Sequence, residues 1–271
     1  WPTFILILLA GIGPLNAGQP SGMSEIVRLD GRSGACRNPR ISVNSQQQAA
    51  VGWIVTSPDG RDSVYLSLGS PMLWEYINPV GPPDESQPRD LAISIDSIGR
   101  LQAVWTAMEN GRRVLKHAVQ DVPSGFSHSR IRLDKLSFPE DSEADFPILS
   151  PDATGGIHIV WQQTGAIQSS IHAVYVDAQS NVVSLGRVSG VIPMAMSPQL
   201  LSHPTDDRLQ VAWYEIEDLG HRVRVDQWNA VRQRWLPSRL ERRARQFESF
   251  GQPSFHYTEL GLVAGWQAED A

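Results

Sequence analysis

Five tryptophans recur along this chain at nearly equal spacing, and each one ends a short apolar segment that follows a proline. The proline-to-tryptophan segments are residues 39–53, 88–105, 147–161, 198–213 and 253–266. Successive tryptophans therefore lie 52, 56, 52 and 53 residues apart. A fixed period of about 50 residues, filled with short strand-like segments, is typical of a β-propeller or another repeat array. We therefore expect the repeats to form one all-β domain.

The second repeat shows how one unit is expected to fold. Residues 91–95 and 101–105 are short apolar segments separated by a turn. Asn110-Gly111 is a strong hairpin signal, with a third strand expected at 113–119 and a fourth at 129–133. Four antiparallel strands in about 50 residues form one propeller blade. The sequence thus predicts a β-propeller of four-stranded antiparallel blades, four complete and a fifth partial.

The strand that leads to each tryptophan is apolar on both faces, unlike a strand in a half-exposed sheet. In the third repeat, Ile157, Ile159 and Trp161 alternate with residues that include Val160. A sheet packed between two neighbouring sheets needs this pattern. We therefore interpret the five tryptophans as packing residues that fill the space between blades, and not as an aromatic platform for a sugar.

The chain begins with an uninterrupted apolar run at residues 4–12, followed by the small residues Ala17 and Gly18. This pattern resembles the apolar core and cleavage site of a secretory signal peptide. We expect three parts: a signal peptide or membrane anchor at 1–18, an N-terminal segment with a closing strand at 19–37, and the propeller repeats at 38–271. The expected location is extracytoplasmic, either periplasmic or secreted, with possible membrane association through the first part.

The repeat combines a proline and an apolar strand with an Asp-x-x-Gly turn and a second apolar strand that ends in tryptophan. Residues 94–99 and 150–152 show the turn most clearly. This form resembles the repeats of exported bacterial β-propellers of the sialidase-like (BNR-type) group, over residues 38–271. The resemblance implies the propeller fold. For a sialidase-like site it would also imply an arginine cluster, a Tyr/Glu nucleophile pair and an acid/base carboxylate.

The sequence does not assemble such a catalytic set. Arg40 and Arg89 occupy equivalent places beside repeat prolines, near the expected axis of the propeller. Tyr214 and Glu215, however, are adjacent in one strand, and adjacent residues of a strand point to opposite faces. The sequence therefore favours a protein that is not an enzyme, while it leaves the question open.

Other chemistry has little support in the sequence. The seven histidines are dispersed without the spacing of a zinc motif, and no Gly-rich phosphate loop or haem motif is present, so we expect no cofactor. Asp96, Asp152 and Asp206 recur at one turn position; we interpret them as turn-forming residues, with calcium binding as the alternative. The single cysteine, Cys36, excludes an internal disulfide. The net charge of −6 argues against general nucleic-acid binding.

A local excess of positive charge lies between residues 222 and 245, where arginines are interspersed with two tryptophans that have no counterpart in the other repeats. Arginine next to tryptophan is common at protein interfaces and near lipid headgroups. A solvated strand edge guarded by charge is the alternative. The predicted partner-binding residues are Arg222, Arg224, Trp228, Arg232, Arg234, Trp235, Arg242, Arg243 and Arg245.

Two functions remain open from the sequence. The favoured one is a non-catalytic extracytoplasmic propeller that acts as an interaction or scaffold module, for example as an extrinsic membrane-attached subunit of a larger photosynthetic or respiratory complex. The expected partner is then a protein or a membrane complex. The alternative is a carbohydrate-binding or sialidase-like glycan-processing propeller. Carboxylates and arginines clustered at the axial mouth would favour the alternative.

Overall fold

The computed structural model describes the chain in segments: 35–70, 73–76, 86–96, 99–121, 125–127, 142–190, 194–203, 206–217, 220–237, 242–243, 249–250, 254–258, 261–265 and 268–269. Within these segments the regular structure is all β, which confirms the all-β part of the prediction. We find no helix in them with the length and apolar character needed to cross a membrane. Several predicted features fall outside the described segments, namely residues 1–34, the fourth strand at 129–133, Arg245 and Trp266.

The strands form four sets of four, in which each strand pairs antiparallel with the next. Set 1 consists of β1 (Ala35–Val43), β2 (Ala49–Thr56), β3 (Asp62–Ser70) and β4 (Leu73–Tyr76). Set 2 consists of β5 (Ser86–Ile95), β6 (Leu101–Glu109), β7 (Arg112–Asp121) and β8 (Gly125–Ser127). These two sets are separate four-stranded sheets.

The third and fourth sets have the same strand order. Set 3 consists of β9 (Glu143–Pro151), β10 (Ile157–Thr164), β11 (Ser169–Val176) and β12 (Val182–Arg187). Set 4 consists of β13 (Met194–His203), β14 (Asp206–Glu217), β15 (Gly220–Asn229) and β16 (Arg234–Pro237). A single parallel pairing of Ser169 with Met194 joins the two sets into one sheet, which also includes β17 (Arg242–Arg243) on β15.

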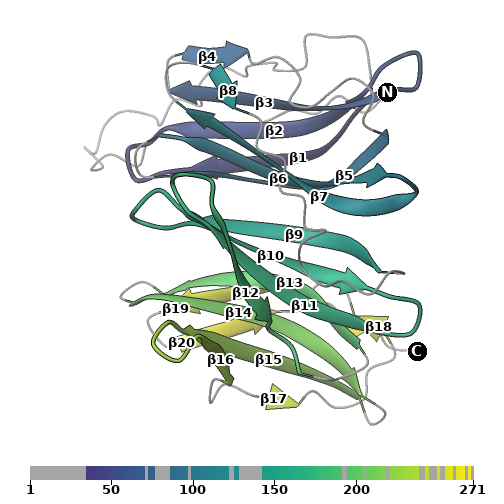
Figure 1. Cartoon of the computed structure of the whole chain (residues 1–271), viewed down its shortest axis with the longest axis vertical. Helices are drawn as coiled ribbons and strands as arrows, with labels where there is room; N and C mark the ends of the chain where they lie inside the picture. The colour runs from purple at the N-terminus through teal and green to yellow at the C-terminus, as the bar shows by residue number, and fades with distance from the viewer. Residues whose placement is uncertain are drawn as a thin grey trace, which may run out of the picture.

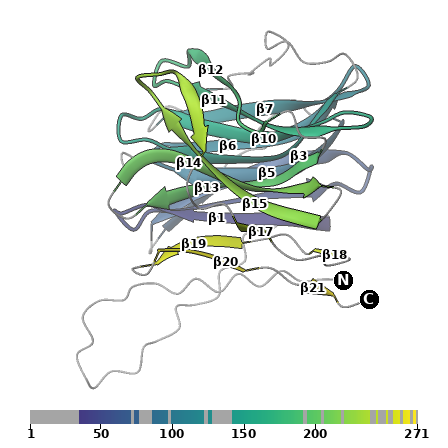
Figure 2. The same ribbon diagram turned by 90° about the horizontal axis from the view of Figure 1, so that it is seen from below.

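The sets follow one another in chain order along the long axis of the molecule (Figure 1). Two further pairs lie at one side of the sets in Figure 2. They are β18 (Ser249–Phe250) with β21 (Ala268–Glu269), and β19 (Ser254–Thr258) with β20 (Gly261–Gly265). The first strands of the sets, which we call the inner strands, lie next to one another in the order β1, β5, β9, β13, with β19 beside β13. The described sheets do not join into a closed ring.

The repeat tryptophans pack between neighbouring sets. Trp53, Trp105, Trp161 and Trp213 are all buried, and Trp161 and Trp213 are 0% exposed. Each of the last three shares a hydrophobic cluster with the preceding set: Trp105 with Ile54, Trp161 with Val104, and Trp213 with Val160. These contacts confirm for Trp105, Trp161 and Trp213 the prediction that the repeat tryptophans fill the space between sheets, whereas Trp53 packs within its own set. Stacking thus removes from water the apolar faces that a single set cannot bury alone.

In sets 2 and 3 the turn between the first and second strands is built around an aspartate side chain. The carboxylate of Asp96 accepts hydrogen bonds from the backbone N and the Nε of Arg100, both at 2.8 Å. The carboxylate of Asp152 accepts one from the backbone N of Gly156, also at 2.8 Å. The turn-forming interpretation of these two aspartates is therefore confirmed. The side chain of Asp206, at the start of β14, lies outside the part of the structure that is described.

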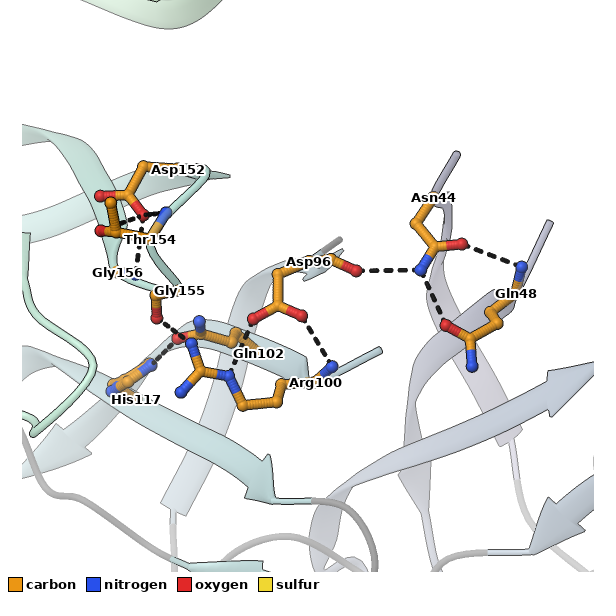
Figure 3. Close-up of polar contacts among 10 residues, drawn as sticks. All are labelled: Asn44, Gln48, Asp96, Arg100, Gln102, His117, Asp152, Thr154, Gly155 and Gly156. Atoms are coloured by element: carbon orange, nitrogen blue, oxygen red, sulfur yellow. Dashed lines mark hydrogen bonds and ion pairs between the residues drawn. The ribbon is translucent and has the colours of Figure 1, made fainter. Parts of the chain in front are cut away.

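Neighbouring turns are also linked sideways (Figure 3). Asn44, in the turn after β1, donates from Nδ2 to the backbone O of Asp96 at 2.9 Å. Arg100, in the turn after β5, donates from Nη2 to the backbone O of Gly155 in the turn after β9. Since each contact crosses from one set to the next, the three turns hold sets 1, 2 and 3 together at this end of the strands.

Replacing Arg100 with methionine should lower the stability of the fold. The side chain of Asp96 is 1% exposed and would lose its cationic partner, while Gly155 would lose a donor from the neighbouring set. We expect a loss of about 2 kcal/mol in the free energy of unfolding, measured by urea denaturation. Arg61→Met is the matched control, because Arg61 is 65% exposed and its ion pair with Asp59 lies at the surface. Equal stability of the two variants would contradict this role for Arg100.

Candidate functional site

Each inner strand of the four sets carries a β-bulge opposite its repeat tryptophan. Two residues of the inner strand stand opposite one tryptophan, at 38–39 opposite Trp53, 90–91 opposite Trp105, 146–147 opposite Trp161 and 197–198 opposite Trp213. In three of the four bulges the second residue is the repeat proline. Proline has no N–H for the ladder, and a bulge is one of the few places in a sheet that accommodates it.

The first residue of each bulge has a positive φ. The angles are 51° at Asn38, 51° at Asp90, 49° at Phe146 and 50° at Ser197. Because none of these residues is glycine, each positive φ carries some strain, which is least at Asn38 and Asp90, whose short polar side chains favour the left-handed region. Such strain gathers at ligand-binding and catalytic sites, and bulges there redirect side chains. The bulges therefore point to the ends of the inner strands just before them as the place to look for a site.

Glu143 and Asp145 lie at such a strand end, on β9, and Asp90 is the first bulge residue of the neighbouring inner strand, β5; we call these three carboxylates the carboxylate cluster. Arg113, at the start of β7, reaches across to β9. Its Nε lies 3.6 Å from Oδ1 of Asp145 and 3.8 Å from Oε2 of Glu143. On β6, Thr106 donates a hydrogen bond from Oγ1 to Oδ2 of Asp90 at 3.4 Å. The cluster is thus built across the junction of sets 2 and 3.

The pKa of Asp145 is raised above its ordinary value of 3.8. Burial is the main cause, and it outweighs a hydrogen bond with Thr164, which lowers the pKa. The negative charges of Asp90 and Glu143 raise the pKa, while the positive charge of Arg113 lowers it. A carboxyl group that keeps its proton to higher pH than an ordinary aspartate is a candidate general acid.

Arg113 is the positive charge of this site. It is 9% exposed, and its Nη1 is buried without a hydrogen-bond partner. A buried guanidinium placed between two carboxylates limits their mutual repulsion and holds both in place. Within the described segments no group of three or more His, Cys, Asp or Glu side chains is arranged to hold a metal ion.

The arginines that the sequence placed near the axis lie beside the bulges of adjacent inner strands. Arg40, on β1, donates from Nε to the backbone O of Leu91 on β5 at 2.8 Å. Arg89, on β5, is exposed and immediately precedes Asp90. Arg37 pairs with Asp62 at 2.6 Å. Arg40 and Arg37 thus also bind neighbouring strands, and Arg89 stands next to the carboxylate cluster in the sequence.

Glu215 is not part of this site. It is 0% exposed, accepts a hydrogen bond from Nε1 of Trp213 at 2.9 Å, and has Nε of Arg224 at 3.7 Å from its Oε2. Its carboxylate is therefore engaged in an internal ion pair. This arrangement agrees with the expectation that Tyr214 and Glu215 do not act together as a nucleophile pair.

The predicted partner-binding residues occupy the outer strands of set 4. Arg232 and Arg234 are exposed. Trp228 and Trp235 are register partners on β15 and β16, with ring centroids 5.3 Å apart, and both pack against the cluster of Trp213. Nε1 of Trp235 also donates to the backbone O of a residue in set 3, at 2.9 Å. The two tryptophans therefore anchor β16 to the core.

The rest of the predicted partner-binding surface is described only in part. Arg222 and Arg224 lie on β15, where Arg224 faces the buried Glu215. Arg242 and Arg243 form β17, which pairs with β15. Arg245 lies outside the described residues. A partner-binding role for this surface remains a prediction.

Replacing Arg224 with methionine should lower the free energy of unfolding, and its effect should not be limited to partner binding. Glu215, which is 0% exposed, would lose the ion pair with the guanidinium of Arg224. We expect a loss of about 2 kcal/mol in the free energy of unfolding, because an uncompensated buried charge is costly. Arg232→Met is the matched control, since Arg232 is exposed in the turn before β16 and should leave the urea midpoint unchanged. If both variants are as stable as the wild type, the ion pair contributes nothing to stability.

The fold is shared with solved structures of low sequence identity. A protein of unknown function from Dyadobacter fermentans has a TM-score of 0.59 at 11% identity and covers 91% of this chain and 76% of its own. A Hadza microbial sialidase has a TM-score of 0.56 at 13% identity, covering 85% and 53%. Sucrose-6-phosphate hydrolase from Lactobacillus gasseri has a TM-score of 0.51 at 13% identity, covering 86% and 53%. The likeness establishes a common fold.

This chain spans only about half the length of the sialidase and of the sucrose-6-phosphate hydrolase. No protein-family profile and no curated protein sequence matches it. The structural similarities include β-propeller glycoside hydrolases, in line with the sialidase-like resemblance of the repeats. No sequence match identifies the BNR-type group itself.

These findings correct the expected function. The sequence favoured a non-catalytic scaffold because no catalytic set could be assembled from it. That expectation is contradicted by the structures that share the fold, which include a sialidase and a sucrose-6-phosphate hydrolase. The error has a physical cause. Asp145 and Glu143 precede the bulge of β9, which offsets the pairing register by one residue, so a regular strand pattern gives no indication of their neighbours.

Proposed function

We propose that this protein is a glycan-processing β-propeller whose active site is the carboxylate cluster of Asp90, Glu143 and Asp145 with Arg113. The observation that carries the proposal is the arrangement of carboxylates from two neighbouring inner strands around one buried arginine. Three carboxylates of two neighbouring inner strands, with an arginine of β7 beside two of them, are the arrangement that separates a glycan-processing site from a scaffold. The fold shared with a sialidase and a sucrose-6-phosphate hydrolase supports the same function.

The chemistry follows from the protonation states. Hydrolysis of a glycosidic bond needs one carboxylic acid, which protonates the leaving oxygen, and one carboxylate on the other side of the sugar. Asp145 is assigned as the acid, because its pKa is raised and it keeps a proton to higher pH than an ordinary aspartate. Asp90, on the neighbouring strand, is assigned as the second carboxylate. Arg113 stabilises the negative charge that remains on Asp145 once its proton has left.

The proposal includes the architecture of the ring. Sets 1 to 4 are four propeller blades, and the pairs β18–β21 and β19–β20 belong to a fifth. The succession of inner strands β1, β5, β9, β13 and β19 supports this reading, since the first strand of each blade lines the axis of a propeller. The candidate site then lies at one mouth of that axis.

A panel of glycosides tests the proposed function. Purified protein is incubated with an aryl sialoside, sucrose, sucrose 6-phosphate and aryl glycosides of neutral sugars, between about pH 4 and pH 8. Release of sugar from one of them is the expected result, and binding is followed in parallel by calorimetry with the corresponding free sugars. A chain that neither cleaves nor binds any compound of the panel would overturn the proposal.

A further inference from the structure

Phe146 differs from the residues at the same position of the other inner strands. It is the first residue of the bulge on β9, where Asn38, Asp90 and Ser197 stand in the other sets. Its φ is 49°, in the left-handed region. Asparagine and aspartate tolerate this region because their short polar side chains bond locally, whereas a large aromatic residue is an outlier there. Of the four residues at this bulge position, Phe146 is therefore the one least suited to a positive φ.

The ring of Phe146 does not contribute to a hydrophobic core that would offset this strain. The residue is 42% exposed and belongs to none of the buried clusters, although its neighbour Ala144 does. The backbone on both sides is held by ladder pairs, Asp145 with Gln162 and Ile148 with Val160. The fold thus presents an exposed aromatic ring in a strained conformation that packing alone does not explain.

We propose that Phe146 is a substrate-contacting residue on which a sugar ring stacks when it occupies the carboxylate cluster. Phe146 directly follows Asp145, the assigned acid, and is the first residue of the bulge, where the regular alternation of side chains between the two faces of a strand is interrupted. The C–H face of a sugar is apolar, and an aromatic ring exposed beside polar groups provides the surface that orients it. A strained backbone conformation is retained where it serves binding. This inference rests on the proposed glycan-processing function.

Substitutions of Phe146 distinguish a role in sugar binding from a role in the stability of the fold. In Phe146→Asn and Phe146→Gly the backbone strain is relieved, so the melting temperature should stay equal to that of the wild type or rise. Sugar affinity should fall, with KM raised about tenfold for the substrate found in the glycoside panel. Ser180→Gly is the matched control. Ser180 has a φ of 66° in the exposed turn after β11, and its replacement relieves strain far from the cluster without changing KM.

The possible results are distinguishable. A raised KM at unchanged or higher melting temperature supports the inference, because a purely structural residue would lower both stability and activity. Unchanged KM in both variants overturns the inference and leaves the proposed function standing. A clear fall in melting temperature with unchanged sugar binding also overturns it, because the ring would then support the fold. If the wild type neither binds nor cleaves any sugar, the proposed function fails and the inference fails with it.

Discussion

Asp145→Asn is expected to lower kcat by a factor of about 10²–10⁴, because the variant has no proton to donate to the leaving oxygen. The fold should remain intact. Since the pKa of Asp145 is raised in the native protein, its charged form reduces stability above that pKa, and stability is regained as the pH falls through it. The asparagine carries no charge, so the variant should be at least as stable as the wild type at neutral pH. Turnover of the panel substrate and urea denaturation measure the two effects.

The matched control for this substitution is Asp177→Asn. Asp177 lies in the exposed turn after β11, where its Oδ1 accepts a hydrogen bond from the backbone N of Asn181 at 2.8 Å, and asparagine can replace it in that role. Its rate should equal that of the wild type. If Asp145→Asn keeps full activity while Asp90→Asn loses it, the acid has been assigned to the wrong carboxylate. If both keep full activity, the carboxylate cluster is not the active site.

Acidification should destabilise the protein well before its ordinary carboxylates titrate. Burial of the imidazoles lowers the pKa of His117 to about 4 and that of His172 to about 4. In the unfolded chain the two imidazoles bind protons near pH 6.5, whereas in the native protein they stay neutral until the pH is much lower. The contribution of the two neutral histidines to the free energy of unfolding is therefore fully present above pH 6.5 and is lost as the pH falls toward 4. For His117, which is 3% exposed, the loss at about pH 5 is about 2 kcal/mol, and His172 adds a smaller amount because it is partly exposed.

Urea denaturation at about pH 7.5 and about pH 5 measures this loss. His117 lies in a hydrogen bond with Oε1 of Gln102, at 3.1 Å from its Nε2, so His117→Gln keeps a donor for that oxygen and removes the titration. The stability difference between the two pH values should shrink by about half in this variant. A pH dependence identical to that of the wild type would show that His117 is not the responsible group. Asp177→Asn should not alter it, because the pKa of Asp177 is lowered and lies below this range.

The fold was largely predictable because its main determinants are local. The apolar segments that end in tryptophan became β2, β6, β10 and β14, whose residues pack between sets as their patterning required. Asp96 and Asp152 formed the turns that their spacing suggested, and Asn110-Gly111 joins β6 to β7. Each of these features depends on neighbours within a few residues or on a repeated face, and both are visible in a sequence.

The candidate site was missed because it depends on contacts between repeats and on a register change. The inner strands begin before the repeat prolines, at Ala35, Ser86 and Glu143, whereas the prolines were read as the start of the unit. A signal was present: Asp90 and Asp145 each lie within two residues of a repeat proline in successive repeats. Arg113, which the sequence places on an ordinary third strand, gives no such signal, because its contact with Asp145 crosses between sets.

The position of the carboxylate cluster at a junction has a consequence for what a single repeat can do. Asp90 belongs to one repeat and Asp145 to the next, and the arginine between Glu143 and Asp145 comes from the earlier of the two. A solitary repeat therefore carries no complete centre, whatever its own residues. The proposed centre exists only where these two repeats meet, so the loss of either repeat, or of the packing between them, would remove it.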